Sequence, residues 1–442
     1  MQRTPDIDLR ATPVTRNRAV DAYRAGAMCL VALGHWLAAA VVRNDDGSLE
    51  GINALSRVPS LHWLTLLFQV MPLFFCLGGY ANAASLDAHR RNGGNNAAWV
   101  VGRLRRLAGP SAWLAGTWTV LLAAGAVTGL ATSLVVAAAA VAAIPLWFLA
   151  NYVIDTAVAP LTLTWHRRRP RRFLGLLGAA FLALELSRLL GIPYLAEANI
   201  VLGWMLFQVL GFWWRDGLVP APRRLLALAG AAAAATAALI ALGPWPLAMV
   251  NVPGADFSNT WPPSLALVAY GVCTTALAMA AAGPLHRLLA RRVGLWKLVA
   301  GANTITMTVY LWHFSAMAAV GGLWAAAGWL GDAPVGSGGW WLAKLPMVAA
   351  ALVVLTGLVA LFGRYEREAL LAQRGGETAS ASLALGAAVG LAGGFELWTL
   401  AAGNPVMTVA GMAAVLGSHR ALRSAGPARH RTAHAEPVLQ PA

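Results

Sequence analysis

Apolar runs of roughly twenty residues alternate with short polar segments along most of the chain. An α-helix of that length crosses the hydrocarbon core of a bilayer. The runs are blocks of Ala, Leu and Val rather than the two-residue alternation of a membrane β-barrel. The pattern therefore predicts an all-α polytopic membrane protein, with about ten helices in its core and a further C-terminal helical pair.

The run boundaries divide the chain into four parts. We predict a cytoplasmic N-terminal tail (1–18), a transmembrane domain (19–365), a C-terminal transmembrane hairpin (366–418) and a disordered cytoplasmic tail (419–442), which is rich in Ala, Pro, Arg and His. The predicted spans are 20–42, 61–84, 109–130, 143–164, 172–190, 197–214, 224–243, 263–283, 299–328 and 341–362, followed by 381–400 and 404–418. Residues 131–143 either extend the third span or form a short re-entrant piece.

Charge and composition assign the orientation. The chain is 58% hydrophobic and 12% charged, about half the charged fraction of soluble domains. The formal net charge is +15, and 28 of the 33 Lys and Arg residues fall in alternate connections that include the N-terminus. This is the positive-inside pattern, so we expect a multi-pass plasma-membrane protein with a cytoplasmic N-terminus. Bases clustered between apolar runs also argue against a nucleic-acid partner.

Small residues recur every four positions in the first helix of the C-terminal pair, at Gly386, Gly390 and Gly394. Such a stripe lets two helices approach closely. We expect it to pack against a helix of the same chain; a homo-oligomer formed through the stripe is the alternative.

The first predicted span contains two polar residues, Arg24 and His35. Eleven residues make three helical turns plus roughly 20°, so both side chains project from one face, about 16 Å apart along the axis. Ionisable groups in a membrane helix are costly and usually functional. His313 lies at a similar predicted depth in 299–328, so His35 and His313 could face one cavity. Two separate hydrogen-bonded core histidines are the alternative.

Other polar residues suggest an anion site and an orienting group. Arg103 and Arg106, spaced by three at the inner end of the third span, could hold phosphate as a fork. An ordinary positive-inside cluster would look the same. Asp155 lies mid-span with Asn151 one turn before it. Because a membrane carboxylate needs a partner, Asp155 could orient a histidine or pair with Arg24, or have a purely structural partner.

The sequence lacks the motifs of several classes of enzyme. It contains no G-x-S-x-G, H-E-x-x-H, G-x-x-x-x-G-K-[ST] or Rossmann G-x-G-x-x-G motif. It also lacks the H-x-x-x-x-D arrangement of glycerolipid acyltransferases. Two buried histidines without a Cys or carboxylate cluster are a poor metal site, so we expect no metal.

Five segments, in order, resemble acyltransferase family 3, the integral membrane acyltransferases that include O-antigen and exopolysaccharide O-acetylases. The resemblance covers about residues 16–365. It rests on the first helix with Arg24 and His35, on MPLFFCLGGY, RLRRLAGP and PLWFLANYV, and on TVYLWHF with its Tyr310 and His313. Two departures are Gly78, where the family usually has Ser, and Asp-Ala-Tyr-Arg in place of Asp-Gly-Leu-Arg at the start of the first helix.

The resemblance implies acyl transfer from a cytosolic acyl-CoA, usually acetyl-CoA, to a hydroxyl of a glycan or lipid-linked acceptor at the outer side. Arg103 and Arg106 would bind the CoA phosphates, and Arg24 would anchor the donor or polarise a partner. His35 would act as general base or accept the acyl group. His313 and Tyr310 would orient the acyl group or stabilise the oxyanion. No permanently bound cofactor is expected.

Two other functions would use the same residues differently. A transporter or flippase could use buried His, Arg and Asp as a proton relay, although the sequence shows no inverted repeat and no matched pair of broken helices. An assembly scaffold without chemistry would leave Arg24 and His35 unexplained.

Overall fold

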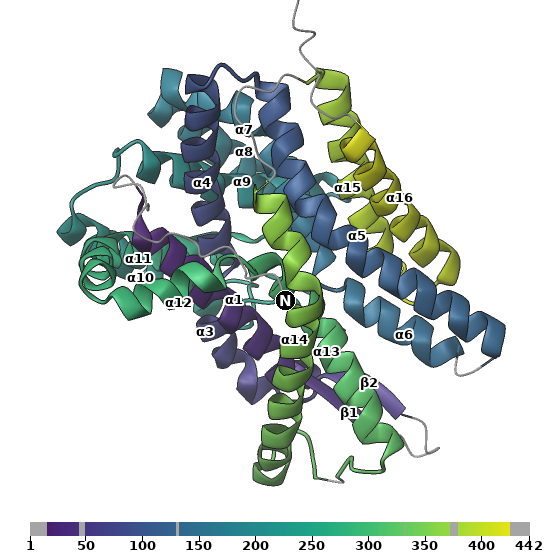
Figure 1. Ribbon diagram of the computed structural model, residues 1–442. Helices are drawn as coiled ribbons and strands as arrows, with labels where there is room; N and C mark the ends of the chain where they lie inside the picture. The colour runs from purple at the N-terminus through teal and green to yellow at the C-terminus, as the bar shows by residue number, and fades with distance from the viewer. Residues whose placement is uncertain (1–15, 44–48, 130–131, 332, 372–378, 425–442) are drawn as a thin grey trace, which may run out of the picture.

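The computed structural model describes residues 16–43, 49–129, 132–331, 333–371 and 379–424, and within them the chain is almost entirely helical (Figure 1). The one sheet is a hairpin of β1 (Ala39–Arg43) and β2 (Leu49–Asn53). The long helices are α1 (Arg18–Ala38), α4 (Met71–Arg91), α5 (Asn96–Thr128), α7 (Leu146–Arg168), α8 (Pro170–Leu189), α9 (Asn199–Arg215), α10 (Pro222–Leu242), α11 (Leu265–Arg291), α13 (Thr306–Ala326), α14 (Gly338–Leu371), α15 (Ala381–Leu400) and α16 (Pro405–Ser424). The shorter ones are α2 (Ala54–Arg57), η2 (Pro59–Leu64), α3 (Thr65–Phe68), α6 (Thr132–Ala143), η3 (Leu195–Ala198) and α12 (Val293–Ala302).

These helices confirm an all-α polytopic membrane protein. Among the described residues, nine helical segments are long and apolar enough to cross a bilayer, whereas the sequence predicts twelve spans. The three predicted spans whose helices are not among these nine are those of α1, α8 and α16. All three carry several charged or polar residues, which lower the mean hydropathy of each helix.

Two predicted spans are interrupted. The span 61–84 begins as η2 and α3, and only after a break at Gln69 and Val70 does α4 start. Pro72 stands in the first turn of α4, where its missing N–H costs nothing. The span 299–328 is likewise divided, because α12 ends at Ala302 and α13 starts at Thr306. A continuous apolar run does not reveal such breaks.

Two other boundaries also differ from the prediction. The first span was predicted to stay helical to residue 42, but its last residues leave the helix and pair as β1 with β2. Val41 and Val42 favour the extended conformation there. Residues 132–143 form a separate helix, α6, after Gly129 ends α5 in a left-handed conformation that glycine adopts without strain. Of the two alternatives for this segment, simple extension of α5 is wrong.

The C-terminal pair, α15 and α16, packs against α5 and α7 (Figure 1). A Cβ at Gly390 would meet Ser418 at 2.3 Å, and one at Gly394 would meet Gly411 at 3.1 Å, so the glycine stripe joins α15 to α16 within the chain. At Gly386 a Cβ would meet nothing within 4 Å. Helix α16 continues to Ser424, so the predicted disordered tail is wrong for its first six residues; 425–442, like the N-terminal residues 1–15, lie outside the described residues.

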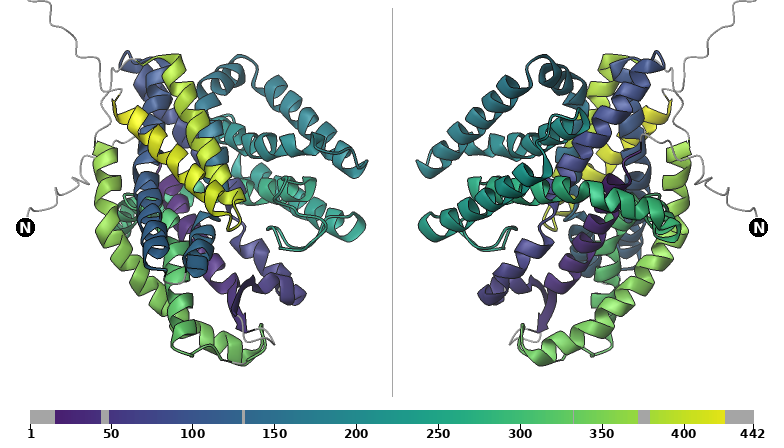
Figure 2. Two further views of the ribbon diagram at one scale, coloured as in Figure 1. Left: turned by 90° about the vertical axis from the view of Figure 1, so that its right-hand side faces the viewer. Right: turned by 90° about the vertical axis from the view of Figure 1, so that its left-hand side faces the viewer.

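Helix α14 runs along one side of the molecule, past α1 and α13 (Figures 1 and 2). The turn between α4 and α5 and the β1–β2 hairpin lie at opposite ends (Figure 1). By the distribution of Lys and Arg, the end with the α4–α5 turn is the predicted cytoplasmic side. Helices α1 and α13 both run from that side toward the hairpin, whereas α14 runs in the opposite direction.

Candidate functional site: a histidine pair and a cation cluster

The structure brings His35 of α1 and His313 of α13 into direct contact. Nδ1 of His35 lies 2.9 Å from Nε2 of His313, and the rings stack with centroids 5.1 Å apart and planes 15° apart. The indole N–H of Trp36, the next residue on α1, donates to the backbone carbonyl of His313 at 2.9 Å. His313 is fully buried, whereas His35 is only partly buried. We call these two side chains the histidine pair.

Hydrogen-bond partners assign the tautomers of the histidine pair. Nδ1 of His313 lies 2.5 Å from the backbone carbonyl of Tyr310, which can only accept, so Nδ1 of His313 carries a proton. In the neutral ring Nε2 of His313 is then an acceptor, and Nδ1–H of His35 donates to it. Nε2 of His35 is left with an unshared electron pair. The backbone of α13 thus prepares one nitrogen of the less buried ring as a base.

Tyr310 contributes its backbone to the histidine pair, and its side chain is engaged elsewhere. The hydroxyl donates to the carbonyl of Pro145, between α6 and α7, at 2.5 Å. Tyr310 is buried, and its ring lies 5.8 Å from that of His313. These contacts fix α13 against the α6–α7 junction. The family resemblance implies that Tyr310 binds the donor by orienting its acyl group or by stabilising the oxyanion; the structure shows the Tyr310 hydroxyl already hydrogen-bonded to Pro145.

Three arginines gather on the predicted cytoplasmic side of the histidine pair. Arg24 of α1 and Arg103 and Arg106 of α5 lie close enough for the charges of Arg24 and Arg103 to act on Arg106. We call them the cation cluster. Nη2 of Arg103 donates to Oδ1 of Asn82 at 2.9 Å and to the Tyr152 hydroxyl at 3.1 Å. Arg24 and Arg106 have no hydrogen-bond partner among the described residues, so two guanidiniums of the cluster keep unused donors that could bind an anion.

A hydrogen-bond chain that sequence reasoning missed holds Arg103. Beyond Arg103, Nδ2 of Asn82 donates to Oε1 of Gln208 at 3.2 Å, and Nε2 of Gln208 donates to the backbone carbonyl of Asp155 at 3.1 Å. Asn82 and Gln208 are only 1% and 2% exposed. Two buried amides inside apolar runs were the available signal, since polar groups in a membrane helix need partners. The chain ties α5 to α4, α9 and α7.

Gly78 makes room for Tyr152, the second partner of Arg103. A Cβ at position 78 would stand 2.8 Å from Cε2 of the Tyr152 ring. The departure from the usual Ser at this position therefore has a local explanation, because glycine lets the tyrosine ring lie against α4 and present its hydroxyl to Arg103.

Asp155 and Asn151 do not reach the histidine pair. The Asp155 side chain is 1% exposed, and neither carboxyl oxygen has a hydrogen-bond partner among the described residues. Nδ2 of Asn151 donates to the carbonyl of Trp147, one turn earlier on the same helix. Asp155 therefore makes no hydrogen bond to a histidine or to Arg24 among the described residues, and the predicted contact is wrong.

A family comparison identifies the membrane domain. The family model described as an acyltransferase domain, that of acyltransferase family 3, matches residues 17–364. The chain belongs to acyltransferase family 3. No curated protein and no solved structure matches it. The matched residues include both members of the histidine pair and all of the cation cluster, whereas α15 and α16 lie beyond them.

In this acyltransferase, aromatic rings connect the histidine pair to the cation cluster. The Phe148 ring lies 5.4 Å from that of Tyr310 and 5.9 Å from that of Tyr152. Tyr310 contacts His313, and Tyr152 contacts Arg103, so the series is continuous from one end of the site to the other. Phe148 and Tyr310 are both buried, so this aromatic series is part of the packed interior between the histidine pair and the cation cluster.

Proposed function

We propose that this protein is a plasma-membrane O-acyltransferase that moves an acyl group, most simply acetyl, from cytosolic acyl-CoA to a hydroxyl of a glycan or lipid-linked acceptor at the outer side. The observation that carries the proposal is the contact between His35 and His313, which leaves Nε2 of His35 as a base. The cation cluster supports a phosphorylated donor because it offers unused guanidinium donors at the predicted cytoplasmic side.

The proposed reaction uses the site from one end to the other. The CoA phosphates bind the cation cluster, and the pantetheine arm extends from there toward the histidine pair with its thioester near His35. The acceptor hydroxyl gives its proton to Nε2 of His35 while its oxygen attacks the thioester carbonyl. The new C–O bond forms, the C–S bond breaks, and the proton passes from His35 to the departing CoA sulfur. His313 acts as a positioning residue, because it holds the His35 ring and fixes its tautomer.

The test measures transfer of label from radiolabelled acetyl-CoA in membranes that contain the protein. Wild-type protein should label an acceptor. His35→Ala should remove transfer, since general-base catalysis contributes ~10²–10⁴-fold, without affecting membrane insertion. A double variant, Arg103→Ala with Arg106→Ala, should need far more donor for the same rate. Full acyl transfer by correctly inserted His35→Ala protein would refute the role of His35 as the general base.

The transporter or flippase is the second candidate, and Asp155 is the observation that favours it. The Asp155 carboxyl is fully buried and has no hydrogen-bond partner in the described part of the chain, and such a group can carry protons across membranes. The same experiment separates the two functions. A transporter would move substrate across proteoliposomes without consuming acetyl-CoA, and Asp155→Asn would stop that flux, whereas the acyltransferase needs the donor in every turnover.

A further inference from the structure

Helix α14 carries a buried charge near each end. Lys344 is 5% exposed and Glu366 is 1% exposed. They are 22 positions apart, which corresponds to about 33 Å along the helix axis. Neither forms a salt bridge with another described residue, although a buried charge in a membrane helix is costly without a partner. Each instead binds the backbone at the end of another helix.

Glu366 binds the start of α13, the helix of His313. Its carboxylate accepts from the backbone N–H of Met307 at 3.0 Å and of Thr308 at 2.8 Å, and from the Thr308 hydroxyl at 2.8 Å. The first N–H groups of a helix lack partners within the helix, and a negative charge there is favourable. Ile305, at the N-cap position of α13, makes no side-chain cap, so Glu366 supplies the missing one from another helix.

Lys344 binds the C-terminal end of α1, the helix of His35. Its ammonium donates to the backbone carbonyls of Trp36 and Ala39, at the end of α1 next to His35. The last carbonyls of a helix are unsatisfied, and a positive charge there is favourable. The signs of both charges therefore match the helix ends that they touch.

We propose that α14 is a clamp that sets the position of His35 relative to His313, with Lys344 and Glu366 as its positioning residues. Helices α1 and α13 are parallel, and sliding one past the other would separate the two rings. One continuous helix holds α1 at the outer end and α13 at the inner end, and so opposes that movement. A slide of about 2 Å across the 2.9 Å contact would lengthen it to roughly 3.5 Å, beyond hydrogen-bond distance. Glu366 lies outside the matched residues 17–364, so the family comparison does not point to it.

The kinetic test of the clamp rests on the proposed function. Glu366→Gln keeps the size of the side chain and removes its charge; Lys344→Met does the same at the other end. Each should lower kcat roughly tenfold or more, because small misplacements of catalytic groups cost up to about a hundredfold. Neither should raise KM for the donor, since Glu366 opposes the positive charge of Arg106 and Lys344 is at the far end. Thr356→Ala, on an exposed part of α14, is the matched control.

A second measurement does not need enzymatic activity. Diethyl pyrocarbonate modifies accessible neutral imidazoles, and mass spectrometry locates the modified residue. His313 should be protected in wild-type and Thr356→Ala protein and should react in both clamp variants, while His62 reacts at an unchanged rate. Lys344→Arg, which keeps charge and donors, should retain protection. If wild-type protein shows no transferase activity, the proposed function fails and the labelling still decides the clamp. The clamp would be refuted if His313 stayed protected from diethyl pyrocarbonate in both clamp variants. It would also be refuted if these variants showed a raised donor KM with normal kcat.

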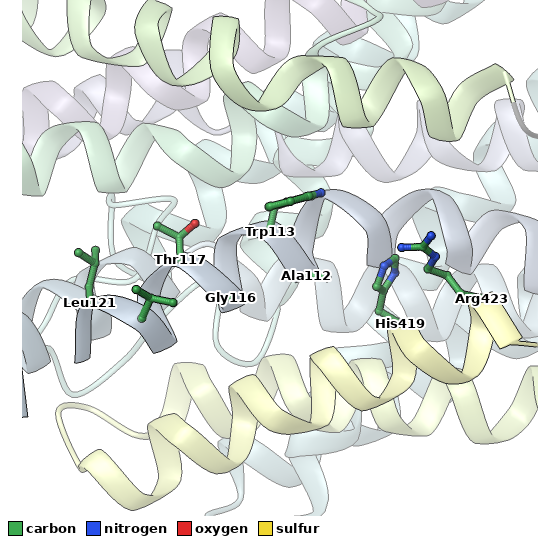
Figure 3. A pocket seen from close by; sticks show the side chains of 8 residues that line it. Ala112, Trp113, Gly116, Thr117, Leu121, His419 and Arg423 are labelled. Carbon is green, nitrogen blue, oxygen red and sulfur yellow. The ribbon is translucent and has the colours of Figure 1, made fainter. Parts of the chain in front are cut away.

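A separate site lies between α5 and α16. A groove with a volume of about 540 Å³ opens there (Figure 3). Ala112 and Gly116 belong to its α5 wall, and Val120 and Leu121 extend it toward the middle of the predicted membrane. These two apolar side chains are 67% and 44% exposed. The groove is therefore open along its length and apolar over most of it.

The cytoplasmic end of this groove is cationic. His419 and Arg423, one turn apart on α16, point toward α5 at that end (Figure 3). Nδ1 of His419 is buried without a hydrogen-bond partner, and Arg423 has none among the described residues. Basic pockets between membrane helices on the cytoplasmic side bind lipid head groups. We infer that the groove holds an anionic phospholipid of the inner leaflet, with its phosphate at His419 and Arg423 and an acyl chain beside Leu121.

Native mass spectrometry of the protein from bicelles of mixed phosphatidylcholine and phosphatidylglycerol tests this site. Wild-type protein should retain phosphatidylglycerol preferentially, and Arg423→Gln should reduce that retention about fivefold, since one basic residue near the surface contributes about 1 kcal/mol. Arg420→Gln removes the same charge from the same helix outside the groove and should change little. Gly116→Leu should displace the chain. Equal losses for the two arginine variants, or equal retention of both lipids by wild type, would refute the site.

Discussion

Replacing Gly78 by alanine should weaken donor binding through Tyr152. The new Cβ would stand 2.8 Å from the tyrosine ring, whereas carbon atoms pack at about 3.5 Å or more, so the ring must retreat by roughly 0.7 Å. The Tyr152 hydroxyl is 3.1 Å from Nη2 of Arg103, and a retreat directed away from Arg103 lengthens this distance to about 3.8 Å, past the limit of a hydrogen bond. A hydrogen bond to a charged group contributes about 1.5–3 kcal/mol. Because Asn82 still holds Arg103, the lower value applies, which is roughly tenfold in affinity.

The assay is the initial rate of label transfer in proteoliposomes as a function of acetyl-CoA concentration. KM should rise about tenfold with kcat within a factor of two, the pattern expected when ground-state and transition-state binding are lost equally. Gly109→Ala, at a position where a Cβ would meet nothing within 4 Å, controls for the general effect of alanine in a helix. Tyr152→Phe should reproduce the rise, and combining it with Gly78→Ala should add little. An unchanged KM in Gly78→Ala, or an equal rise in Gly109→Ala, would refute this reasoning.

Three further outcomes follow from the site and the fold. His313→Phe should lower kcat at least roughly a hundredfold with little change in donor KM, because the remaining imidazole loses its partner and its fixed tautomer; initial rates measure both constants. Raising the salt concentration tenfold should raise KM for acetyl-CoA but not for a neutral thioester without phosphates, because ions screen the cation cluster. Gly411→Ala, whose Cβ would stand 2.6 Å from the backbone of α15, should lower the thermal unfolding midpoint by a few degrees, whereas Gly386→Ala should not.

Helical periodicity carries most of what the sequence reveals about the histidine pair. The eleven-residue spacing places Arg24 and His35 on one face, and the structure has one of them in the cation cluster and the other against His313. The depth of His313 in the membrane is less well predicted, because the prediction counts it from the start of a continuous span at residue 299. The helix of His313 begins only at Thr306. The two rings nevertheless meet, since α1 and α13 pack side by side.

Contacts between distant segments account for what the sequence could not provide. Periodicity indicates which face of α4 holds Asn82, but not that α9 presents Gln208 to it, 126 residues later in the chain. The same holds for Glu366, which looks like one more charge in a cytoplasmic segment until α14 is placed beside the start of α13. Apolar runs also hide the breaks that create helix ends, and Glu366 acts on one of those ends.

The junction between α1 and β1 has no linker. The helix ends at Ala38 and the strand begins at Ala39, three residues after Trp36. The hairpin is therefore continuous with the last turn of α1, and a displacement of the hairpin would act on the helix end that Lys344 holds. An acceptor that displaces the hairpin as it docks would move the base without touching it. Under the proposed function, continuous backbone therefore joins the predicted outer surface, where the acceptor would arrive, to the reacting nitrogen.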